Sequence, residues 1–191
     1  MNKIKKKLSF LYKSLIKLLF IIVYGKIIFC KNPENEKDIS IEEVKDENLR
    51  DPNNLKYLIY KIKNGRIFND FVENVAIISG NKIIDKVSYQ QVKGEFKDAN
   101  HNSVLYKGTP YLKKKFKGRV LSLTQGASGH KNYFHWLYDI LPKINICSKN
   151  YNLKKIDYLY ISNLATYQKS TLEILGYHNF KIIDSNKNRH I

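Results

Sequence analysis

The last third of the chain alternates between apolar runs of strand length and longer segments with helical periodicity. Strands are predicted at residues 119–124, 156–162 and 180–183, and helices at residues 132–147 and 164–175, the second closed by Gly176. A β-α-β-α-β order requires parallel strands joined by helical crossovers, which are right-handed in nearly all proteins. The sequence therefore predicts the parallel sheet of an open α/β fold.

Upstream of this unit, the chain has the pattern of short strands separated by turns. Residues 57–62 alternate between polar and apolar side chains, and residues 75–79 form an apolar run that ends at Gly80. Residues 82–90 can pair back on that run as a hairpin, and residues 104–106 predict one more short strand before Gly108. We therefore assign residues 55–191 to a single α/β domain.

Residues 1–31 contain many lysines and no acidic residue. On a helix, the leucines fall on one side and most lysines on the other, as in a helix that lies in an anionic lipid interface. The uninterrupted apolar run between Lys17 and Lys26 has about eight residues, whereas a helix needs about 20 to span a bilayer. We therefore predict an interfacial anchor at residues 1–31, with a spanning anchor, a signal peptide and a core helix as alternatives.

Residues 32–54 reverse the charge, because acidic residues cluster there; we predict a solvated linker between anchor and domain. The whole chain nevertheless carries a formal net charge of +17, from 34 basic and 17 acidic side chains. This charge favours anionic partners such as a membrane surface, while the scarcity of arginine argues against a nucleic acid. Cys30 and Cys147 lack zinc-site spacing and are predicted to be free thiols.

The segment from residue 126 to residue 144 holds the candidate site. On a helix, Asn132, His135 and Asp139 share one face, and the spacing of His135 and Asp139 lets their side chains touch. The opposite face is expected to pack on the sheet and consists of Tyr133, Leu137, Ile140, Leu141 and Ile144. Such a polar face is often merely solvated. This helix, however, starts at the carboxyl edge of a predicted parallel strand, where open α/β sheets bind ligands.

This position gives the polar residues possible chemical roles. His135, oriented by Asp139, is a candidate general base or a contact for a substrate hydroxyl. The glycine turn at residues 126–129 supplies backbone N–H groups for an anion but matches neither a P-loop nor a dinucleotide-binding fingerprint. Trp136 is either a core residue or a sugar platform. The spacing of His130 and His135 does not fit a zinc helix, and no D-x-D motif offers a handle for a divalent metal.

The pattern N-x-F-H-W-x-x-D-x-L-P in this segment resembles the motif of glycosyltransferase family 61. Its positions are Asn132, Phe134, His135, Trp136, Asp139, Leu141 and Pro142. The segments IDYLYIS, TYQKSTLEILGY and FKIID that follow also resemble the family, as does YGKI after the basic helix. The resemblance implies the N-terminal Rossmann-like domain of a GT-B glycosyltransferase, which handles the acceptor. We expect the C-terminal, donor-binding domain to be absent from this chain.

The resemblance further implies an inverting, metal-independent transfer from a nucleotide sugar to a surface polysaccharide (capsule or lipopolysaccharide) or glycolipid acceptor. We assign Asp139 or His135 as the catalytic base, and Asn132, Trp136 and His130 as acceptor contacts. No cofactor is expected besides the nucleotide-sugar donor. The predicted location is the cytoplasmic face of the inner membrane, with peripheral or single-anchor attachment. The alternative is an inactive membrane-bound remnant, or half of a split enzyme that needs a partner chain.

Overall fold

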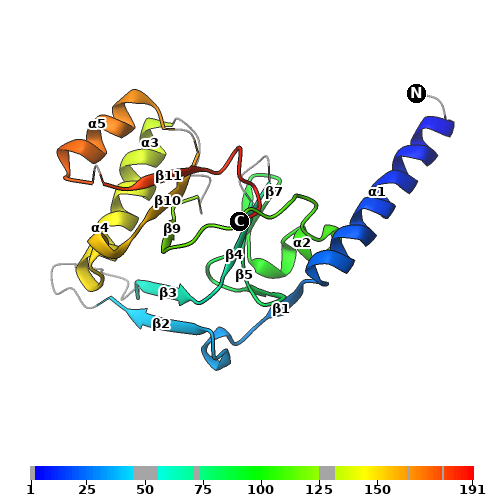
Figure 1. Cartoon of the computed structure of the whole chain (residues 1–191), viewed down its shortest axis with the longest axis horizontal. Helices are drawn as coiled ribbons and strands as arrows, with labels where there is room; N and C mark the ends of the chain where they lie inside the picture. The colour runs from blue at the N-terminus through cyan, green and yellow to red at the C-terminus, as the bar shows by residue number, and fades with distance from the viewer. Residues whose placement is uncertain (1–2, 45–55, 71–73, 125–131, 163, 178) are drawn as a thin grey trace.

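The computed structural model describes residues 3–44, 56–70, 74–124, 132–162, 164–177 and 179–191. Helix α1 (Lys3–Tyr24) projects from one end of the molecule, as Figure 1 shows. A mixed sheet lies in the middle, and a parallel sheet with its helices lies at the other end. The candidate site belongs to the parallel sheet.

The parallel sheet consists of β9 (Val120–Ser122), β10 (Tyr158–Ile161) and β11 (Lys181–Asp184), in the order β11-β10-β9. Tyr158 of β10 is in register with Val120 on one side and with Lys181 on the other. The helices between these strands are α3, η3 and α4, which together cover residues 133–150, and α5 (Thr166–Ile174). The predicted β-α-β-α-β order with parallel strands is therefore confirmed, while the GT-B architecture stays a prediction.

One apolar core fixes these helices on the parallel sheet. It joins Leu159 and Ile161 of β10 to Ile140 and Ile144 of the first helix and to Leu172 of α5. Burying an aliphatic side chain of this kind contributes about 1.5–3 kcal/mol, so the helix face that carries the core residues is firmly held. The orientation of the opposite face, which carries the candidate site, follows from this packing.

The mixed sheet has the strand order β1-β6-β5-β4 and contains β1 (Ile28–Cys30), β4 (Arg66–Asn69), β5 (Val75–Ser79) and β6 (Lys82–Ile84). Strands β5 and β6 form a hairpin at the predicted place, with Gly80 in its turn at a φ of 56°, but the second strand ends at Ile84 and does not continue over the predicted residues 82–90. Strand β1 runs parallel to β6. A second core, which includes Ile77 of β5, Tyr160 of β10 and Ile183 of β11, connects the two sheets.

The remaining elements are short. The paired strands are β2 (Ile39–Glu43) with β3 (Leu58–Ile62), and β7 (Gln90–Val92) with β8 (Glu95–Lys97). The short helices are η1 (Pro33–Asn35), η2 (Ala99–His101), α2 (Val104–Lys107) and η4 (Leu153–Lys155). At the C-terminal end, Ile191 exchanges two backbone hydrogen bonds with Ile67 of β4, each with an N–O distance of 3.0 Å, which ties residues 189–191 to the mixed sheet.

Helix α1 ends at Gly25, whose φ of 81° is a conformation that favours glycine. The buried Arg66 holds this end in place: its guanidinium donates to the carbonyl of Gly80 at 2.8 Å, to Asn81 Oδ1 at 3.1 Å and to the carbonyl of Tyr24 at 3.4 Å. Most side chains of α1 that the structure describes are exposed, including many large apolar ones. Within the described residues, no helix has the length and apolarity that a membrane span requires.

The structure corrects several predicted boundaries. The anchor was predicted to reach Lys31, but α1 ends at Tyr24 and residues 28–30 form β1, because the apolar side chains of Ile27 and Cys30 are buried in the domain core. Residues 32–54 were predicted as a linker; within them, residues 39–43 form β2, which pairs with β3 and buries Ile39 in an apolar cluster, and residues 45–54 lie outside the described residues. Residues 104–106 were predicted as a strand but belong to helix α2.

Candidate functional site

The helix that follows β9 is built from α3 (Tyr133–His135), the π-helical segment η3 (Trp136–Ile140) and α4 (Leu141–Asn150). In η3, the N–H of Leu141 donates to the carbonyl of Trp136, five residues earlier. Pro142 explains this turn: proline has no N–H, and in an uninterrupted α-helix its ring would clash with the carbonyl four residues before it. Segments of π-helix of this kind recur at functional sites.

His135 and Asp139 form a close pair on this helix. His135 Nδ1 lies 2.6 Å from Asp139 Oδ2, and the two side chains are 31% and 33% exposed. An ionised carboxylate only accepts hydrogen bonds, so in the neutral imidazole the shared proton is on Nδ1 and the lone pair is on Nε2. The predicted contact between these side chains is present. An imidazole that a carboxylate orients in this way has the geometry of a general base.

Two exposed aromatic side chains lie beside the His135–Asp139 pair; we call Phe134 and Tyr138 the aromatic strip. They are 60% and 65% exposed, and their ring centroids are 4.7 Å apart. The ring of Phe134 also meets the His135 ring edge-on, with a centroid distance of 5.8 Å. Because residues four apart are neighbours on a helix, the strip and the pair form adjacent columns. Together they offer an apolar stacking surface next to hydrogen-bonding groups, which suits a sugar ring.

The site lies at the carboxyl edge of the parallel sheet. The helix with His135 follows β9, and α5 follows β10, so both helices begin at this edge. Their first turns touch, because Tyr133 packs edge-on against Tyr167 with a centroid distance of 5.4 Å. Tyr133 was predicted to face the sheet but is 61% exposed, since the π-helical turn rotates the residues before it relative to those after it. Open α/β sheets bind ligands at this edge.

The predicted acceptor contacts do not all lie at the surface beside the His135–Asp139 pair. Trp136 is 1% exposed and packs in the core with Ile140, so it is a core residue rather than a sugar platform. Asn132 is exposed, and its Oδ1 accepts a hydrogen bond of 2.9 Å from the N–H of Phe134, which makes Asn132 the N-cap of the helix. His130 and the glycine turn at residues 126–129 lie outside the described residues.

Lys143 is a candidate site residue that the sequence prediction missed. It follows Asp139 by one helical turn and is partly buried in α4. Burial lowers the pKa of Lys143 to about 8, and the Asp139 carboxylate opposes this shift in part. Ionisable groups with displaced pKa values gather at functional sites. The sequence did contain a signal for Lys143: His135, Asp139 and Lys143 are spaced four residues apart, which places all three on one helix face.

In the part of the chain that the structure describes, no three His, Cys, Asp or Glu side chains come together as potential metal ligands. Comparisons of the chain with family models, with curated proteins and with solved structures gave no match. The chemistry of the site is therefore inferred from its geometry and from the motif of residues 132–142.

Proposed function

We propose that this protein is an inverting glycosyltransferase that works at a membrane surface, and that the described residues form its acceptor-binding side. The observation that carries the proposal is the His135–Asp139 pair, with its Nδ1–Oδ2 distance of 2.6 Å, beside the exposed aromatic strip. The location of this pair at the carboxyl edge of a parallel sheet supports a ligand site, and the resemblance of residues 132–142 to glycosyltransferase family 61 supports a sugar. The basic, apolar helix α1 supports attachment to an anionic membrane.

The proposed reaction uses the unprotonated Nε2 of His135. An acceptor sugar stacked on the aromatic strip presents a hydroxyl to this nitrogen, which takes up the hydroxyl proton. The oxygen forms a bond to the anomeric carbon of the donor while the bond from that carbon to the nucleotide diphosphate breaks, so the configuration inverts. Asp139 acts as a positioning residue, because it holds the imidazole tautomer and stabilises the imidazolium that forms.

A transfer assay tests this proposal. Membranes that contain the full chain are incubated with radiolabelled nucleotide sugars, and label in glycolipid and polysaccharide is counted. His135→Gln and Asp139→Asn are expected to reduce transfer by at least about 100-fold, the usual range for loss of a general base. The matched control is Glu173→Gln, which neutralises an exposed acid on α5 and leaves transfer unchanged. Equal transfer by Asp139→Asn and Glu173→Gln would remove the pair from the chemistry.

A second candidate function is one half of a split glycosyltransferase, with the donor domain on a separate chain. The observation that favours it is that the candidate acceptor site is built from one all-parallel sheet and its helices, so a donor domain on another chain can complete it. The split-enzyme proposal predicts transfer only when the product of a neighbouring reading frame is added. Transfer by the full chain alone contradicts the split enzyme. An absence of transfer with every added chain supports an inactive remnant.

A further inference from the structure

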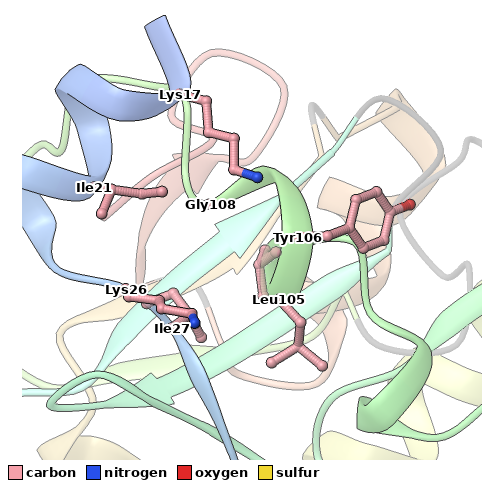
Figure 2. Close-up of a pocket in the computed structure, with 8 residues that line it drawn as sticks. Lys17, Ile21, Lys26, Ile27, Leu105, Tyr106 and Gly108 are labelled. Atoms are coloured by element: carbon pink, nitrogen blue, oxygen red, sulfur yellow. The ribbon is translucent and has the colours of Figure 1, made fainter. Parts of the chain in front are cut away.

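The junction between α1 and α2 forms a small cavity that is partly open to solvent and that the sugar chemistry does not use. Its volume is about 60 Å³, and the residues that matter here are Lys17, Ile21, Lys26, Ile27, Leu105 and Tyr106. Figure 2 shows Lys17 and Ile21 on α1, Lys26 and Ile27 on the chain after it, and Leu105 and Tyr106 on α2. The cavity therefore lies where the helix predicted to contact the membrane meets the folded domain.

The charges at this cavity are all positive. Lys17 and Lys26 are both exposed; in Figure 2 the side chain of Lys17 ends beside α2, near Gly108, and that of Lys26 ends beside Ile27. The ion pairs found among the described residues include neither lysine, and the sequence of α1 contains no acidic residue. Two ammonium groups on one cavity without a carboxylate between them favour a bound anion.

The size and the lining of the cavity indicate which anion fits. One water needs about 10–15 Å³, so the cavity of about 60 Å³ has room for about four to six waters, and we compare this space with one tetrahedral phosphate. Ile21, Ile27 and Leu105 make its walls apolar, which suits carbon atoms attached to that phosphate. Leu18 and Ile22 are exposed on the neighbouring face of α1 and continue the apolar surface away from the cavity. This combination fits a phosphate joined to acyl chains.

The surface around the end of α1 has the same character. The N–H of Lys113 donates to Tyr24 Oη at 2.9 Å, which brings a lysine-rich segment next to the end of the helix. Leu112, beside it in the chain, is 80% exposed. Apolar and cationic side chains thus share one surface, the composition that binds an anionic lipid interface. The hydrogen bonds of Arg66 to Tyr24 and to the β5–β6 turn fix α1 relative to this surface.

We propose that the cavity between α1 and α2 binds the phosphate headgroup of an anionic membrane lipid, with Lys17 and Lys26 as its two cationic contacts. The acyl chains of this lipid lie along the apolar residues of α1, and the headgroup positions the domain on the membrane. This inference rests on the membrane attachment in the proposed function, but it is independent of the sugar chemistry.

The test measures binding of the full chain to phosphatidylcholine vesicles that contain phosphatidic acid. One double variant, Lys17→Gln with Lys26→Gln, removes the two cavity cations. The matched control, Lys5→Gln with Lys13→Gln, removes the same charge from exposed positions of α1 that do not line the cavity. Both variants lose the general attraction of two lysines. The cavity variant is expected to bind at least about tenfold more weakly than the control, because it also loses hydrogen bonds to the phosphate.

The outcomes separate the possible explanations. Equal losses in the two double variants would overturn the cavity site and leave membrane attachment intact. Failure of the unaltered chain to bind anionic vesicles would contradict membrane attachment as well. Inorganic phosphate added at constant ionic strength is expected to leave the vesicle-bound protein in place. If inorganic phosphate releases the protein from the vesicles, the cavity prefers the free anion, and this result would contradict a lipid ligand.

Discussion

The buried histidine His190 makes the stability of the fold depend on acid. Its side chain is 1% exposed and packs edge-on against the ring of Tyr24, with a centroid distance of 4.8 Å. Nδ1 donates to the carbonyl of Tyr111 at 2.9 Å, and Nε2 is buried with no hydrogen-bond partner among the described residues. Burial is the main reason why the pKa of His190 falls from 6.5 to about 4; the hydrogen bond to Tyr111 opposes this shift, and the neighbouring cations Arg66 and Lys113 add to it.

The sign and the size of the effect follow from these pKa values. Above pH 6.5 the imidazole is neutral in both the folded and the unfolded chain, so the full stability is present. Between pH 6.5 and pH 4 the unfolded chain takes up a proton that the folded chain does not, which favours unfolding. Each pH unit in this window costs about 1.4 kcal/mol, so His190 alone removes about 2 kcal/mol by pH 5 and about 3 kcal/mol by pH 4.

Urea denaturation of the full chain, followed by the fluorescence of the single, buried Trp136, measures this effect. His190→Phe keeps an aromatic ring between Tyr24 and Phe68 but cannot titrate. Its free energy of unfolding should therefore fall about 2 kcal/mol less than that of the unaltered chain between pH 7 and pH 5. The exposed His101 gives the control, since His101→Gln removes one imidazole but leaves the buried His190 in place and should keep the acid dependence that His190 causes. If the free energy of unfolding of His190→Phe has the same pH dependence as that of the unaltered chain, His190 is not the source of the acid sensitivity.

Three further predictions follow from single side chains. Among ¹³C-methylated lysines followed by NMR, Lys143 should titrate near pH 8; finding every lysine near pH 10.5 would contradict its burial. Arg66→Met should lower the free energy of unfolding by about 2–4 kcal/mol in a urea titration, because buried carbonyls lose a charged donor. The control Arg119→Met, at an exposed position, should change the free energy of unfolding by less than about 0.5 kcal/mol. Asn132→Ala should cost about 1 kcal/mol in the same titration and Asn132→Ser much less, since serine also caps helices; equal costs would exclude a capping role.

The parallel end of the fold was predictable because its signals are local and long. Apolar runs at β9, β10 and β11 alternate with helical segments, and Gly176 marks the end of α5, at a φ of 77°. The spacing of His135 and Asp139 likewise predicted their contact. Residues four apart on a helix meet whatever the rest of the chain does, so this part of the site needed no tertiary information.

The errors occurred where tertiary packing or a short motif decides the structure. The apolar run at Ile27 was read as part of the anchor, although Gly25 signals the helix end, and only pairing with β6 shows that this run is a strand. Val104–Lys107 is too short to show a period; its helix starts where Asn102 Oδ1 accepts from the N–H of Val104 at 3.1 Å. Trp136 packs in the core with Ile140, four residues later on the same helix face, and its predicted role as an acceptor contact rested on the family resemblance alone.

The most direct test of the proposed sugar site is an NMR titration of the ¹⁵N-labelled His135 side chain with oligosaccharides from bacterial surface polysaccharides. We predict that the neutral imidazole carries its proton on Nδ1, and that the Nε2 resonance moves when saccharide is added. Phe134→Ala, which shortens the aromatic strip, should weaken saccharide binding about 5- to 30-fold, because it removes about 1–2 kcal/mol of stacking. The control Phe96→Ala changes an exposed aromatic residue on β8 and should leave saccharide binding unchanged. A neutral imidazole with its proton on Nε2, or a resonance that no saccharide moves, would contradict the proposed sugar site.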